Sequence, residues 1–116
     1  MNLNWTMKFN VLFSSTFKKE LKRIAKKHRQ ILKDIHALSD ELANNPTLGT
    51  DLGRNVYKIR VAISGTAKGK SGGARVITYV KVSNESVILA EIYLKSEHAT
   101  IDVQAVIKRL KADNLL

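Results

Sequence analysis

Apolar and polar residues alternate in two stretches of the chain, and a two-residue period predicts β-strands with one buried face. The first stretch covers residues 5–13 and places an aromatic-rich set of side chains on one side. The second covers residues 56–63, where apolar residues such as Ile59 point one way while Lys58 and Arg60 point the other. We therefore expect a half-buried strand that carries two cations on its polar face.

Two further apolar runs, at residues 74–82 and 87–95, follow the second strand directly. A glycine-rich tip at residues 65–73 and a polar turn at residues 83–86 are the connections. Consecutive strands with such short connections pair as an antiparallel meander.

The hydrophobic period lengthens to three or four residues in two other regions, and this period predicts amphipathic helices. Residues 14–16 offer capping hydroxyls, and a break near residues 28–30 leaves open either two helices packed as a hairpin or one long bent helix. Pro46 ends this region, because proline cannot donate to a helical ladder, and residues 47–53 are expected to form a loop. Thr100 is the expected cap of a last helix. The apolar stripes are Phe17, Leu21, Ile24 and Ala25, then Ile31, Ile35, Leu38 and Leu42, and finally Val103, Val106, Ile107 and Leu110.

The resulting element order, β-α-α-β-β-β-α, predicts an α+β fold. Helices of this length need a sheet face to bury against, so we expect two layers, with an antiparallel sheet packed against the helical hairpin. The chain has 116 residues, and residues 1–116 are expected to form one domain.

The charge balance is unusual for so small a chain. Twenty Lys and Arg against ten Asp and Glu give a net charge of +10, which favours a polyanionic partner. Cysteine is absent, which excludes disulfides and thiol chemistry, and the three histidines lack metal-ligand spacing. No signal peptide or membrane span is recognisable. These features predict a cytoplasmic protein with no metal, no cofactor and no membrane partner.

The basic residues concentrate on the predicted hairpin, because residues 52–84 contain seven Lys or Arg and no Asp or Glu. Its glycine-rich tip is not a nucleotide-binding loop, since the spacing is one residue short and a strand follows where a helix should begin. Glycines in the tip could let a backbone approach a ligand closely, and a merely solvated polar face is the plainer alternative. The cations that we expect to converge on one surface are Lys58, Arg60, Lys68, Lys70, Arg75 and Lys95, with Tyr93 beside them.

The first predicted helical region is also basic, with eight Lys or Arg between residues 18 and 33. Such a run is typical of a diffuse electrostatic surface that attracts nucleic acid without reading its sequence. We expect RNA contacts here, with Lys22 and Lys26 as representatives.

Three motifs together resemble the RelE/HigB-type toxins of bacterial toxin–antitoxin modules: Lys58-Ile59-Arg60, the Gly-Lys-x-Gly-Gly-x-Arg run at residues 69–75, and Tyr93-x-Lys95. The resemblance implies a toxin that enters the ribosomal A site and cleaves mRNA, close to ribosomal RNA, and a cognate antitoxin that silences it. Carried over by position, the candidate catalytic residues are Lys58, Arg60, Lys70, Arg75, Tyr93 and Lys95, and Lys68 is a candidate RNA-binding residue.

The implied reaction is metal-independent attack of a ribose 2′-OH on the neighbouring phosphate. Lys58 or Lys95 is the expected base, because nearby cations disfavour the charged form of a lysine, with Tyr93 as an alternative base or stacking platform. Arg60 and Arg75 would stabilise the charge on the phosphorane. The hairpin surface is expected to be flat and without a cavity, so the ribosome would have to shape the RNA. Two alternatives stay open: a ParE-like inhibitor of DNA gyrase, and a non-catalytic RNA- or ribosome-binding domain.

Overall fold

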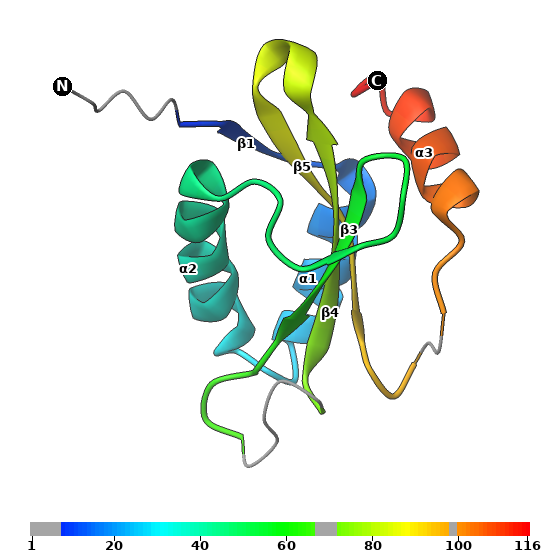
Figure 1. The fold of residues 1–116 in the computed structure, drawn as a ribbon. Coiled ribbons are helices and arrows are strands. Elements are labelled where there is room, and N and C mark those ends of the chain that lie inside the picture. The colour runs from blue at the N-terminus through cyan, green and yellow to red at the C-terminus, as the bar shows by residue number, and fades with distance from the viewer. Residues whose placement is uncertain (1–7, 67–71, 98–99) are drawn as a thin grey trace, which may run out of the picture.

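The computed structural model describes residues 8–66, 72–97 and 100–116, and confirms the α+β class (Figure 1). The two central helices are separate, which settles the choice between a hairpin and one bent helix. A single turn of 3-10 helix at Val82–Asn84 occupies the predicted polar turn. The elements are β1 (Asn10–Phe13), α1 (Ser15–Ala25), α2 (Ile31–Asn44), β2 (Thr50–Asp51), β3 (Val56–Val61), β4 (Ala74–Lys81), β5 (Ser86–Leu94) and α3 (Val103–Ala112).

The strands form a single sheet in the order β1-β5-β4-β3-β2. Strands β3, β4 and β5 make the predicted antiparallel meander. The sheet as a whole is mixed, however, because β1 pairs with β5 in parallel, and so it is not the purely antiparallel sheet that we expected. The predicted loop at residues 47–53 also contains the two-residue strand β2, which pairs with Tyr57 and Lys58 of β3.

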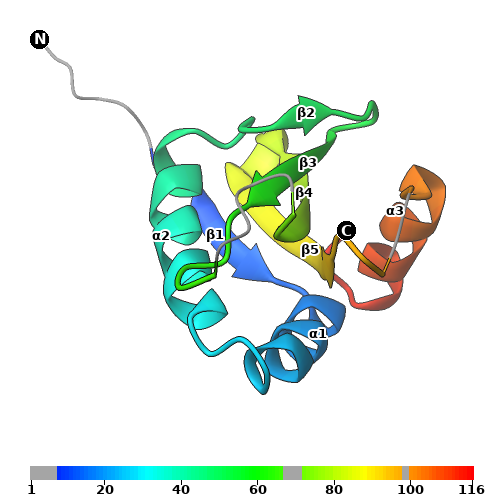
Figure 2. The same cartoon turned by 90° about the horizontal axis from the view of Figure 1, so that it is seen from below.

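Helices cover both faces of this sheet. On one face α1 and α2 bury residues such as Phe17 and Leu42 against β3, β4 and β5. On the other face α3 buries Val106 and Leu110 against Ile77 and the neighbouring strand residues. Figure 2 shows α3 on the side of the sheet opposite α1 and α2. The expected two layers are therefore supplemented by a partial third.

Polar contacts fix the ends of α3. Asp102 caps its N-terminus by accepting the backbone N–H of Ala105 at 3.2 Å, so the cap is not the expected Thr100. Arg109 pairs with Glu91 of β5, and Asp113 accepts the backbone N–H of Ser15 at 2.8 Å. The last helix is thereby tied to both β5 and α1.

One irregularity in β5 changes which way its side chains face. Ile77 pairs with Glu91 but Thr78 pairs with Leu89, so Ala90 has no partner on β4 and forms a β-bulge. Before the bulge, Leu89 faces α1 and α2; after it, Tyr93 faces α3. A regular strand would place residues 89 and 93 on the same face. The bulge therefore turns Tyr93 to the face that carries Arg75.

Ser14 holds this bulge. Its hydroxyl donates to the carbonyl oxygen of Ala90 at 2.7 Å and accepts the backbone N–H of Phe17 at 3.0 Å, which caps α1. Ser14 is buried, so water cannot readily replace either bond.

Replacing Ser14 by alanine should therefore destabilise the protein by about 2 kcal/mol, roughly half from the lost cap and half from the unpaired carbonyl. Urea unfolding measures this value from the shift in midpoint at constant m. Ser83→Ala, at an exposed position, is the matched control and should stay within about 0.5 kcal/mol of the wild type. Equal stability of the two variants would contradict the role given to Ser14.

Candidate functional site

The meander brings together five of the residues that the sequence singled out. Arg60 lies opposite Arg75 on β3 and β4, and Arg75 lies opposite Tyr93 on β5, so the three share one rung of the ladder. Lys58 precedes Arg60 by two residues on the same face, and Lys95 follows the end of β5. All five line one open pocket of about 600 Å³. The expected convergence is present, but the surface is hollowed rather than flat.

The remaining predicted residues are placed differently. Lys68 and Lys70 lie outside the described residues. Lys22 on α1 and Lys26, which directly follows this helix, are exposed and do not line the pocket. They belong to the basic surface of the first helix, as the sequence indicated, and are separate from the pocket.

Arg75 is the most enclosed cation of the pocket, with 6% of its surface exposed. Its Nη1 atom donates to the carbonyl oxygen of Ala74 at 3.2 Å. Arg60 on the adjacent strand is exposed. The rung thus presents one arginine held in the wall of the pocket and one that can adjust to a ligand.

Tyr93 forms the boundary between the pocket and the core below α3, since it belongs to both. Burial raises the pKa of its phenol, an effect that the positive charge of Arg75 opposes and the negative charge of Glu91 reinforces. Tyr93 therefore keeps its proton well beyond neutral pH and can donate a hydrogen bond to an anion in the pocket.

Gly73 joins the strands at the base of the hairpin. A side chain there would collide with the backbone carbonyl of Val61, so the close approach that glycine permits is to β3 and not to a ligand. The carbonyl of Gly73 in turn accepts the backbone N–H of Lys95 at 3.0 Å. This bond fixes the start of the turn that carries Lys95.

The sequence did not single out two residues of the pocket, Ser96 and the charged Glu97. The carboxylate of Glu97 accepts two hydrogen bonds from the guanidinium of Arg23 on α1, both at 2.9 Å. The available signal was the pattern Tyr93-x-Lys95-x-Glu97, but strand alternation says nothing of where a side chain points once the strand has ended.

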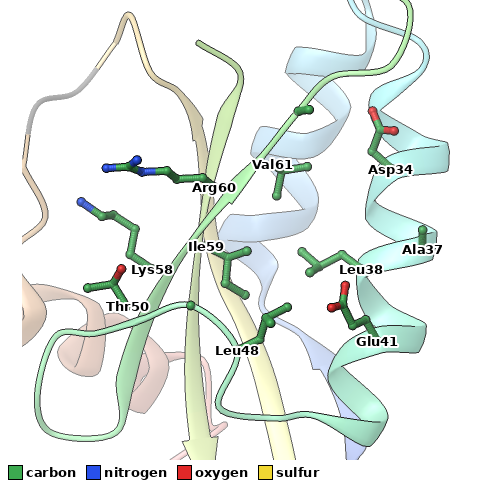
Figure 3. A pocket seen from close by; sticks show the side chains of 12 residues that line it. Asp34, Ala37, Leu38, Glu41, Leu48, Thr50, Lys58, Ile59, Arg60 and Val61 are labelled. Atoms are coloured by element: carbon green, nitrogen blue, oxygen red, sulfur yellow. The ribbon is translucent and has the colours of Figure 1, made fainter. Parts of the chain in front are cut away.

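A second hollow, of about 590 Å³, lies on the other side of β3, between this strand and α2 (Figure 3). Leu38, Leu48 and Ile59 supply apolar surface there, while the side chains of Lys58 and Arg60 point away from α2. The groove lacks a converging set of cations, so the basic pocket is the better candidate for an active site.

Among the described residues, no three His, Cys, Asp or Glu side chains lie close enough together to hold a metal ion. None of the helices in this part of the chain has the length and apolar character needed to cross a membrane.

This fold is that of a small toxin class. Residues 13–113 match the family described as the RelE toxin of the RelE/RelB toxin–antitoxin system, and the chain belongs to that family. A solved structure of an E. coli RelE mutant in the free state is similar, with a TM-score of 0.57 and 16% sequence identity. That likeness covers 95% of this chain and 100% of the other, and it shows a shared fold. No curated protein matches the chain.

The environment of Tyr93 predicts its titration. The difference in tyrosinate absorbance between the wild type and Tyr93→Phe should have a midpoint above pH 10, because burial disfavours the phenolate. Circular dichroism at each pH verifies that both proteins remain folded. A midpoint below pH 10 would mean that the cations of the pocket outweigh burial.

Proposed function

We propose that this protein is the toxin of a type II toxin–antitoxin module and acts as a ribosome-dependent mRNA endoribonuclease. The observation that supports this most is the rung Arg60–Arg75–Tyr93, flanked by Lys58 and Lys95 in one pocket. Four cations and a protonated phenol form a binding site for a phosphodiester that gains negative charge as it reacts.

The proposed reaction begins with attack of a ribose 2′-OH on the adjacent phosphorus. A phosphorane forms, the bond to the 5′-oxygen of the next nucleotide breaks, and the products carry a 2′,3′-cyclic phosphate and a 5′-OH. Arg60 and Arg75 bind the non-bridging oxygens, since guanidinium groups match phosphate in a bidentate manner. The enclosed position of Arg75 favours it as the preorganised donor.

Two proton transfers accompany this reaction. Lys58 or Lys95, in its deprotonated form, is the proposed base for the 2′-OH, because both line the pocket. The raised pKa of Tyr93 favours the opposite role, so the phenol donates its proton or a hydrogen bond to the leaving 5′-oxygen. This assignment replaces the idea of Tyr93 as a base.

The basic surface of α1 supplies the attraction to ribosomal RNA. Lys22 and Lys26 are exposed there, and contacts of this kind release counterions, so binding should weaken steeply as salt rises. The pocket itself is open, and the ribosome would align the 2′-OH with the phosphorus. The proposed setting is the cytoplasm, and the proposed partners are mRNA on the ribosome and a cognate antitoxin. The family description names a toxin–antitoxin system, which supports the antitoxin.

Arg75→Ala tests this function. It should lower the rate of mRNA cleavage on programmed ribosomes by roughly 10²–10³ and abolish growth arrest on expression, because the preorganised donor to the phosphorane is lost. Primer extension maps and quantifies the cuts. Lys108→Ala, a single-charge change at an exposed position of α3, is the control for net charge.

An Arg75→Ala protein as toxic as the wild type would exclude the pocket as the active site. Intact mRNA together with loss of gyrase supercoiling would support a ParE-like toxin instead. Intact mRNA with ribosome binding, and with gyrase unaffected, would support a non-catalytic domain.

A further inference from the structure

Glu97 is the single carboxylate among the described residues that line the basic pocket. The cations around it are those to which a phosphate would bind. A carboxylate free to move among them would form ion pairs there and compete with the substrate. The pocket can therefore bind an anion only if other contacts restrain the side chain of Glu97.

Arg23 supplies that restraint from α1, far away in sequence. Its Nη1 and Nη2 atoms each donate to a different oxygen of Glu97, both at 2.9 Å, and its Nε donates to Glu20 at 2.8 Å. The hydrogen bonds to Glu97 and Glu20 raise the pKa of Arg23, so it remains charged. A bidentate pair fixes direction as well as distance, so the carboxylate is aimed at α1.

The backbone of the turn adds to this restraint. Oε1 of Glu97 also accepts the backbone N–H of Leu94 at 3.0 Å, and the backbone N–H of Glu97 donates to the carbonyl of Leu94 at 2.9 Å. Lys95 lies inside this closed turn. Three donors already engage the carboxylate of Glu97, which makes it a poor base for a 2′-OH.

We propose that Arg23 is a positioning residue of the phosphate site: it orients the carboxylate of Glu97 toward α1 and so prevents it from competing with the RNA for the cations of the pocket. The inference deepens the proposed function and rests on the same pocket. In this proposal Arg23 has a positioning role, whereas the other cations of α1 contribute only positive charge.

This role predicts an unusual pattern of double variants. Arg23→Ala releases Glu97 into the pocket, so it should weaken phosphate binding roughly fivefold, the scale of one partly exposed ion pair. Adding Glu97→Gln removes the competing charge and should restore binding. If the pair served only to stabilise the turn, the double variant would be no better than Arg23→Ala alone.

The first measurement is the affinity for inorganic phosphate, determined by NMR from the chemical shifts of the backbone amides of Gly73 and Lys95. It is made at constant ionic strength for the wild type, Arg23→Ala, Glu97→Gln and the double variant. Lys19→Ala removes one charge from α1 without touching Glu97, and Glu97→Gln should not rescue any loss it causes. Thermal unfolding verifies that all variants are folded at the temperature used.

The second measurement is mRNA cleavage on ribosomes, where Arg23→Ala should raise KM by a similar factor and the double variant should lower it again. Loss of phosphate binding that Glu97→Gln does not rescue, or no loss in Arg23→Ala, overturns the inference. A wild-type protein that does not bind phosphate at these amides overturns it too. If the phosphate series behaves as expected but the wild type cuts no mRNA, the positioning role stands and the nuclease proposal fails.

Discussion

The extra residue in β5 is the constraint on which the pocket depends. Ala90 has no partner on β4, and this bulge reverses which side chains of β5 point to each face of the sheet. Tyr93 therefore shares a face with Arg75. The buried hydroxyl of Ser14 has two roles, since it donates a hydrogen bond to the carbonyl of Ala90 and caps α1. The start of the first helix and the geometry of the site are thereby linked through a single side chain.

The pairing of β3 with β4 also creates an unfavourable charge arrangement. Arg60 and Arg75 lie directly opposite each other on neighbouring strands, and like charges in this position destabilise a sheet by roughly 0.2–1 kcal/mol. The strands keep this register because slipping by one residue would expose the core residues that β3 and β4 bury on both faces. An anion between the arginines would relieve the repulsion, which supports the proposed role of this rung in binding phosphate.

The sequence was sufficient for those parts of the molecule that follow from local periodicity. Alternation in residues 56–63 identified β3 and the shared direction of Lys58 and Arg60, and the short connections predicted the meander. It was insufficient where distant segments meet. The parallel pairing of β1 with β5 joins residues 76 positions apart, as with Asn10 and Ser86. The bulge at Ala90 lies in an apolar run with no glycine or proline to mark it. The contact between Arg23 and Glu97 joins a helix to a turn, and neither element has a pattern that indicates the other.

The chemistry of the pocket is consistent with an enzyme that needs another macromolecule to align its substrate. Its described lining residues offer cations and a protonated phenol, which stabilise a developing charge, but no histidine, and its carboxylate is engaged by Arg23. Such a site lowers the energy of a phosphorane once it begins to form, whereas bringing the 2′-OH into line with phosphorus requires a fixed RNA conformation. An open pocket does not impose that conformation. In the proposed function the protein supplies charge and the ribosome supplies alignment, and this division is the physical argument for dependence on the ribosome.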